Sequence, residues 1–163
     1  GEYEEEFAPD LYTGETDLLL RHNDPVRPDS YYGASKSFGE DLGRYYVESH
    51  EYPKRFYALR ICTVNMPEYD HPYGDAEQKA EEGLFDRDSD EYDHWVRRMK
   101  AMWQSRRDFA HMVDCCLQDD DVEFDVFHGV SDNENRWFDL EHARTRLGYR
   151  PRDDGSEWDE PPA

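Results

Sequence analysis

Tyr32 and Lys36 are four residues apart in the segment Tyr-Gly-Ala-Ser-Lys, a spacing that places both side chains on one face of a helix. A lysine ammonium group beside a phenol favours the phenolate and lowers the phenol pKa from its ordinary value of about 10. Such a phenolate can take a proton from an alcohol while a hydride leaves the same carbon atom. The pair therefore indicates alcohol oxidation, although this spacing also arises by chance and decides nothing alone.

The residues around this pair predict the elements that must position it. Ser30 is a suitable cap for a helix over residues 30–50. An apolar run over residues 56–61 predicts a buried strand soon after that helix. Gly39 and Gly43 lie four apart within the helix, which indicates either simple tolerance or the close approach of another helix.

Later segments repeat the alternation of helix and strand. We expect a helix from Ser105, a strand over 124–130 and a helix over 139–147. Three segments are expected to lack regular structure: a loop over 1–29, an acidic insert over 68–94 and a disordered tail over 153–163. The alternation predicts an α/β fold with a largely parallel sheet. Two strands are few for such a sheet, and no glycine-rich phosphate loop occurs, so we expect the neighbouring strands to lie outside this chain.

The charge balance is strongly acidic. Aspartate and glutamate number 40 against 19 lysine and arginine residues, a formal net charge of −21. This balance argues against nucleic acids and anionic membranes as partners, and no apolar run is long enough for a transmembrane helix. Only four basic residues are lysines, and abundant carboxylates with scarce lysine suit a protein that works in molar salt. The composition predicts a halophilic, cytoplasmic protein, with an ordinary acidic protein as the alternative.

The cysteines and the one acidic cluster with a histidine predict no further chemistry. Cys62, Cys115 and Cys116 are too few for a disulfide scaffold and are expected to be reduced. The spacing of Asp70, His71 and Asp75 fits no standard metal template, so no metal site is expected.

Four segments, in order, resemble the extended short-chain dehydrogenases/reductases, the NAD-dependent epimerase/dehydratase family. Residues 28–40 resemble the active-site helix of that family. The other matches are the following strand (57–61), a later helix start (107–114) and the closing LGxxP signature (147–151). Within the family, residues 98–109 and 136–139 are similar to hexuronate dehydrogenases and haloarchaeal NAD-dependent glucose-6-phosphate dehydrogenases. The resemblance implies the C-terminal part of a Rossmann-type parallel sheet plus a small substrate-binding lobe.

The resemblance also implies roles for five residues and NAD as the cofactor. Tyr32 matches the catalytic base, and Lys36 matches the lysine that tunes it and holds the nicotinamide ribose. Val64 matches a backbone position that touches the nicotinamide, and Thr63 a hydroxyl residue that contacts substrate. Arg98 matches the arginine that pairs with the C6 carboxylate of the sugar, and its fork also suits a phosphate. The alternatives are a solvated or ion-paired arginine and a polar strand end for Thr63.

The family's catalytic serine, its glycine-rich turn and the acid that selects NAD over NADP match nothing in this sequence. We therefore expect the chain to be one partial domain, divided into a loop (1–29), the catalytic helix and following strand (30–66), substrate-lobe elements (67–152) and the tail. The implied function is oxidation of the C1 hydroxyl of a small aldose derivative, a hexuronate or glucose 6-phosphate, to a lactone. The alternatives are a sugar-nucleotide epimerase or dehydratase fragment and a non-catalytic interaction module. The family commonly forms homodimers through the helix over 30–50.

Overall fold

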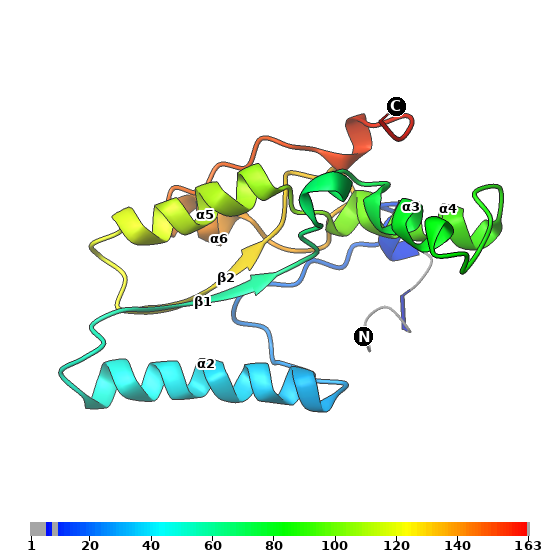
Figure 1. Cartoon of the computed structure of the whole chain (residues 1–163). Helices are drawn as coiled ribbons and strands as arrows, with labels where there is room; N and C mark the ends of the chain where they lie inside the picture. The colour runs from blue at the N-terminus through cyan, green and yellow to red at the C-terminus, as the bar shows by residue number, and fades with distance from the viewer. Residues whose placement is uncertain (1–5, 8–9, 163) are drawn as a thin grey trace.

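The computed structural model describes residues 6–7 and 10–162 of the chain (Figure 1). In chain order its elements are the 3-10 helix η1 (Asp10–Tyr12), α2 (Tyr31–Ser49), β1 (Phe56–Ile61), η2 (Pro67–Tyr69), α3 (Gly74–Glu81), α4 (Asp90–Met102), α5 (Arg106–Gln118), β2 (Phe124–Gly129), α6 (Glu141–Arg146) and η3 (Gly155–Glu157). This order confirms the predicted α/β fold. It also confirms the helix after Ser30 and the two strands.

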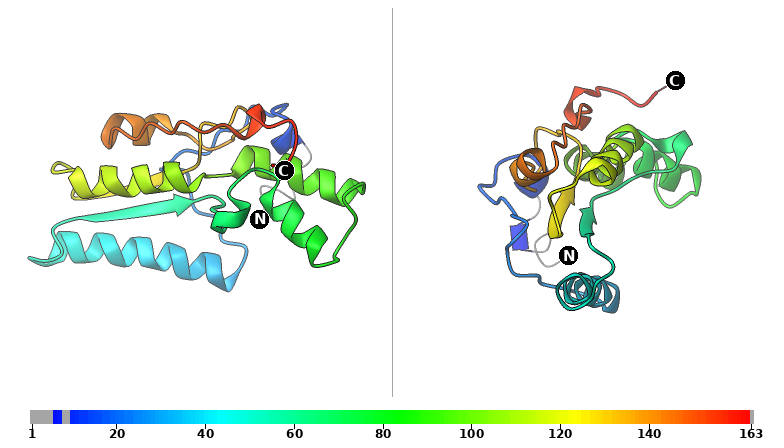
Figure 2. Two further views of the ribbon diagram at one scale, coloured as in Figure 1. Left: turned by 45° about the horizontal axis from the view of Figure 1, so that its top comes forward. Right: turned by 90° about the vertical axis from the view of Figure 1, so that its left-hand side faces the viewer.

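The two strands form a parallel sheet between two layers of helices. The register runs from Phe56 opposite Phe124 to Ile61 opposite Gly129. The helix α2 covers one face of the sheet, and α5 and α6 lie on the other (Figures 1 and 2). Among the described residues β1 and β2 are the whole sheet, so β1 has one unpaired edge.

The main core lies between the sheet and the α5–α6 layer. Met112 of α5, Phe127 of β2 and Tyr149 after α6 are each fully buried there. The Tyr149 hydroxyl donates to the carbonyl of Val130 at 3.0 Å, which satisfies its polar end inside the core. The turn before Tyr149 uses Gly148, whose φ of 72° is the left-handed conformation typical of a residue that ends a helix.

The helix α2 packs on the sheet through a glycine. Ser30 caps it by accepting the backbone N–H of Gly33 at 3.1 Å. Gly43 is buried, and a Cβ built on it would lie 2.4 Å from the ring of Phe56, whereas Gly39 faces open space. The close approach at Gly43 is therefore made by Phe56 of β1, and among the described residues it is not made by another helix.

The helix α3 and the start of α4 occupy about half of residues 68–94, so the prediction that this segment is irregular was wrong for that half. Ser89 caps α4 by accepting the N–H of Tyr92 at 3.2 Å. Tyr92 and Val96 of α4 pack against Tyr73 and Ala76 at the start of α3 in a small buried cluster. Acidic residues fill the first turns of both helices, where the helix dipole favours negative charge. Because acidic residues dominate these segments, the narrow apolar face that stabilises each helix is not evident from the sequence.

Within residues 67–152, the helices α3 and α4 project beyond the end of the sheet, whereas α5, β2 and α6 belong to its layers (Figure 1). The early loop contains the short helix η1, whose Leu11 and Tyr12 are buried against Trp137 and Ala101.

The segment after residue 152, expected to be disordered, is held by a buried network around Asp108. The Asp108 carboxylate accepts the Ser131 hydroxyl at 2.6 Å and the backbone N–H groups of Arg152 and Asp153 at 2.9 and 3.0 Å. Asn133 then accepts the N–H of Gly155 at 2.8 Å. The polar composition of this segment suggested disorder, but its backbone donors are satisfied by side chains distant in the sequence.

Replacing the buried Asp108 with alanine is expected to lower the free energy of unfolding by about 3 kcal/mol, because the buried Ser131 hydroxyl and two partly buried backbone N–H groups would lose their acceptor, and an unsatisfied buried donor costs about 1–3 kcal/mol. Urea unfolding of the chain in concentrated KCl, followed by circular dichroism, measures this loss. Asp114→Ala is the matched control, since Asp114 is exposed on the same helix. Equal losses in the two variants would contradict a structural role for the network.

Candidate active site

Tyr32 and Lys36 lie side by side on the first turns of α2. The Lys36 ammonium nitrogen is 4.9 Å from the centroid of the Tyr32 ring, so the cation sits beside the phenol. The Tyr32 side chain is 71% exposed, which leaves its hydroxyl accessible to a ligand. The helix itself holds the pair in place, because the Ser30 cap fixes the turn from which both side chains project.

Both residues face a cavity of about 660 Å³ between α2 and the unpaired edge of β1, which we call the edge groove. Its walls include Tyr32 and Lys36 from α2, Cys62 just after β1, and Met102 and Phe138 from later segments. The groove therefore joins the predicted acid–base pair to the carboxyl end of a parallel strand, where α/β proteins commonly bind ligands.

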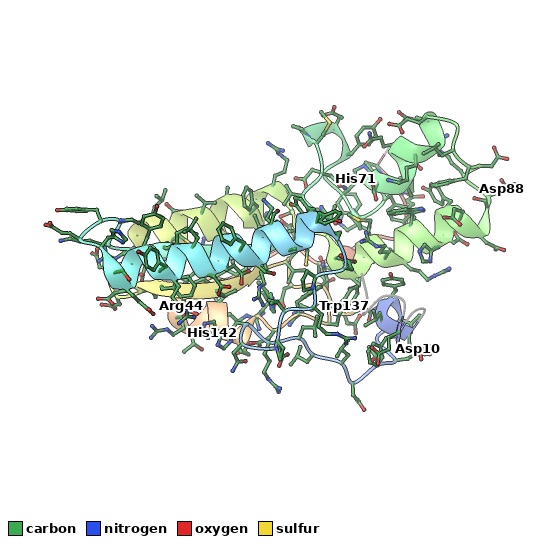
Figure 3. All side chains as sticks on the ribbon, turned by 90° about the horizontal axis from the view of Figure 1, so that it is seen from below. Asp10, Arg44, His71, Asp88, Trp137 and His142 are labelled. Atoms are coloured by element: carbon green, nitrogen blue, oxygen red, sulfur yellow. The ribbon has the colours of Figure 1, made fainter. Side chains whose placement is uncertain are left out.

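A second cavity of about 330 Å³, the loop groove, lies on the other side of Lys36. Pro28 from the loop before α2 lines it together with Trp137 and Phe138. Figure 3 shows Trp137 close to the N-terminal end of α2. Because Lys36 lines both cavities, its ammonium group can reach a ligand in either one.

An ion pair that the sequence did not reveal separates the two grooves. Arg60 of β1 donates to both carboxylate oxygens of Glu40 on α2, each at 2.8 Å. Arg60 also donates to the carbonyl of His22 at 3.3 Å. A charged residue within an otherwise apolar strand run was the available signal, because a partly buried arginine requires a partner. The two-point contact fixes α2 against β1 and so supports the position of Lys36.

The histidine opposite Arg60 in the sheet is neutral near pH 7. Burial, and then the positive charge of Arg60, lower the pKa of His128 to about 4. The charged side chains that line both grooves include Lys36, Arg60 and Glu40. The neutral His128 imidazole adds no charge to them.

Thr63 and Val64 follow the end of β1, and that end of the strand lies at the same end of the sheet as the start of α2 (Figure 1). Thr63 forms a parallel bridge with Trp103: its N–H donates to the carbonyl of Met102 at 3.0 Å, and its carbonyl accepts the N–H of Gln104 at 2.8 Å. Both residues are half-buried, and neither lines the edge groove or the loop groove. Thr63 and Val64 therefore follow the strand that lines the edge groove, outside the walls of both cavities.

Arg98 lies on α4, in the part of the molecule that projects beyond the sheet. Its guanidinium carbon is 5.4 Å from the ring centroid of Trp95, one turn earlier on the same helix. Arg98 lines neither groove, so the structure does not bring it into one cavity with Tyr32 and Lys36. The Thr63–Trp103 bridge nevertheless ties the end of α4 to the end of β1.

No helix in the described part of the chain combines the length and the apolar character needed to cross a membrane.

Comparison with known proteins finds similarity to sugar dehydrogenases. No protein-family model matches the chain. The chain is 30% identical over 151 residues to the NAD-dependent glucose-6-phosphate dehydrogenase of Haloferax volcanii. The aligned residues cover 93% of this chain and 48% of that enzyme. It is 33% identical over 129 residues to the uronate dehydrogenase of Pseudomonas syringae pv. tomato, covering 79% of this chain and 36% of that enzyme.

A solved structure agrees with these relatives. The glucuronic acid dehydrogenase of Chromohalobacter salexigens superimposes with a TM-score of 0.64 at 26% identity, covering 86% of this chain and 42% of that structure. The chain therefore spans about half the length, or less, of the proteins it matches. The resemblance to the hexuronate and glucose-6-phosphate dehydrogenase branch of the extended short-chain dehydrogenases is confirmed, as is the C-terminal part of a Rossmann-type fold.

Proposed function

We propose that this chain is the C-terminal part of an NAD-dependent dehydrogenase that oxidises the C1 hydroxyl of a hexuronate or of glucose 6-phosphate to a lactone. The observation that carries the proposal is the Tyr32–Lys36 pair, with the ammonium nitrogen 4.9 Å from the phenol ring centroid at the edge groove. The names of the relatives, a glucose-6-phosphate dehydrogenase and uronate dehydrogenases, support the same chemistry.

In this proposal Tyr32 removes the proton while C1 loses a hydride. As the phenolate, Tyr32 accepts the proton of the C1 hydroxyl, and the C1–O bond becomes the carbonyl of the lactone. Lys36 stabilises the phenolate by its positive charge and would contact the nicotinamide ribose. Bound NAD supplies the acceptor for the hydride.

The edge groove suits the nicotinamide end of the cofactor better than its phosphates. It is open and brings Tyr32 and Lys36 together, and Val64 lies just beyond the strand that lines it. A dinucleotide also needs a tight glycine turn before a helix to receive its pyrophosphate. Among the described helices none begins with such a turn, so the remaining contacts are assigned to sequence that this chain does not contain.

On the substrate side we assign Thr63 and Arg98 to the sugar. The arginine fork can bind a carboxylate or a phosphate at two points, and either group occurs at C6 of the proposed substrates. The bridge between Thr63 and Trp103 supports this assignment because it links α4, which carries Arg98, to the end of β1. A ligand that contacts both Thr63 and Arg98 must lie across the bridge between Thr63 and Trp103.

The test is NAD reduction by glucuronate and by glucose 6-phosphate, measured on the chain joined to a nucleotide-binding half of the same family. The proposal predicts NADH formation with at least one of these sugars. A protein that instead interconverts sugar nucleotides without net NADH formation would be an epimerase, and the proposed oxidation would be wrong.

We also infer that α2 forms a homodimer contact. Four of its large apolar side chains are 38–67% exposed, which is unusual for one helix face: Phe38, Leu42, Tyr45 and Tyr46. Light scattering of the wild type and of a Phe38→Ser, Tyr45→Ser variant tests this inference, which requires a dimer in the first and a monomer in the second. A monomeric wild type at micromolar concentration would overturn it.

We further propose that the protein is halophilic, and we expect its melting temperature to rise between low salt and about 2 M KCl. The net charge is −21, and a Debye length of about 3 Å at 1 M salt screens the repulsion among surface carboxylates. Thermal unfolding followed by circular dichroism across this range is the measurement. A flat or falling melting temperature would favour the ordinary acidic protein.

A further inference from the structure

Three side chains that are far apart in the sequence meet at the junction of the early loop, β2 and α6. They are His22, which precedes α2, Asp125 on β2 and His142 on α6. Each offers one ligand atom, and these atoms all lie within 4.8 Å of one another. Figure 3 shows His142 on the α6 side of the molecule, away from the lobe formed by α3 and α4.

The geometry of this cluster leaves donor atoms unused. The two imidazole rings stack with centroids 3.5 Å apart and planes 8° from parallel. His142 Nε2 is buried and lies 2.9 Å from Asp125 Oδ2, a contact without hydrogen-bond geometry. His22 Nδ1 is buried and has no hydrogen-bond partner. A buried imidazole nitrogen without a partner is uncommon because its desolvation is then not compensated.

The backbone on each side holds the three residues in place. Leu20 donates to the carbonyl of Trp137 at 2.8 Å and accepts the N–H of Asp139 at 2.9 Å, which anchors the loop two residues before His22. Asp125 Oδ1 accepts the N–H of Val126 at 2.8 Å, so its Oδ2 faces the histidines. The other face of the His142 ring lies against Phe127, with centroids 5.2 Å apart.

Two imidazoles and one carboxylate are a ligand set that Zn²⁺ and similar divalent ions prefer. Tetrahedral zinc with Zn–N bonds of about 2.0–2.1 Å holds two nitrogen ligands about 3.3–3.4 Å apart. The ligand atoms of the three residues lie within 4.8 Å of one another, so they are near enough to share one ion. Because the two rings are stacked and nearly parallel, their side chains must rotate out of the stack to direct both nitrogen lone pairs at the same point.

We propose that His22, Asp125 and His142 form a binding site for one divalent transition-metal ion, with water completing its coordination. Such an ion would join the loop before α2 to β2 and α6. The bound ion would hold the loop that leads into α2, the helix that carries Tyr32 and Lys36, in one position. Arg146 lies 3.7 Å from Asp125 Oδ2, but its side chain is 51% exposed and can move into solvent when a cation binds.

The proposal is tested by calorimetric titration of the chelator-treated chain with ZnCl₂ at neutral pH in concentrated KCl, which suppresses diffuse binding to surface carboxylates. We expect one equivalent of zinc to bind with a Kd of about 10 μM or tighter. His22→Gln and His142→Gln should each weaken binding by about 10-fold or more, because each removes one of three protein ligands. His50→Gln is the matched control, since His50 is exposed at the end of α2.

X-ray absorption spectroscopy of the zinc-loaded wild type gives a test that needs no variant. Two imidazole ligands per zinc would support the site. An oxygen-only shell, no stoichiometric binding, or unchanged affinity in both His22→Gln and His142→Gln would overturn it.

Discussion

Tyr32→Phe, introduced into the chain joined to a nucleotide-binding half, is expected to lower kcat by about 10²–10⁴-fold or more, because the phenol is the only proposed proton acceptor for the C1 hydroxyl. The ring and its contact with Lys36 remain, so the affinity for NAD should change little. Steady-state kinetics with the preferred sugar and a separate NAD titration measure the two effects.

Tyr31→Phe is the matched control for this variant. Tyr31 is the adjacent residue on the same turn, and its side chain is 98% exposed, so removal of its hydroxyl should leave kcat unchanged. If Tyr32→Phe retains more than about a tenth of the wild-type kcat, Tyr32 is not the base. If both variants lose activity equally, the loss comes from disturbance of the helix start.

The elements around the active-site pair were predictable because their signals are local. Ser30 and Ser105 cap their helices through their own side chains, as the sequence indicated. The strands β1 and β2 are short apolar runs, which can be recognised from consecutive residues alone. The four-residue spacing of Tyr32 and Lys36 likewise needs only the helix to bring the two side chains together.

What the sequence missed depends on contacts between distant segments. The Arg60–Glu40 pair joins a strand to a helix, and Asp108 holds backbone donors more than 40 positions later in the chain. The His22–Asp125–His142 cluster is assembled from three separate segments, so no short sequence motif predicts it. Local patterns cannot reveal such pairs, because their energy depends on the burial that the fold creates.

The role of Arg98 illustrates the difference between a matching position and an assembled site. The sequence resemblance places this arginine at the substrate, whereas the structure places it over Trp95 on α4, outside both grooves. The lobe that carries it is joined to the sheet through the short bridge at Thr63 and Trp103.

Residues 1–163 alone are expected to show no binding of NAD tighter than about 100 μM, which corresponds to about −5.5 kcal/mol. The pyrophosphate of a dinucleotide is held by backbone N–H groups at a glycine turn that opens a helix. Two of the described glycines serve other purposes: Gly43 makes room for Phe56, and Gly129 ends β2 against Gln104. No described helix of eight or more residues begins with a glycine-rich turn that could hold the phosphates.

The unpaired edge of β1 also supports the expectation that the chain alone does not bind NAD. This edge lines a cavity of about 660 Å³, and Ile61 at its end is 41% exposed. A parallel strand added beside β1 would cover the edge and complete one wall of the groove below Tyr32 and Lys36. We therefore expect NAD affinity to appear only when a nucleotide-binding half is joined to the chain or added as a separate polypeptide.

Calorimetric titration of the purified chain with NAD, with and without that half, is the measurement. Lys36→Met provides the matched variant, because it removes the ammonium group from both grooves and keeps a side chain of similar length. In the completed protein this variant should weaken NAD binding, whereas in the chain alone it should change nothing. Binding by the chain alone that is tighter than about 100 μM and sensitive to Lys36→Met would mean that the edge groove itself holds the cofactor.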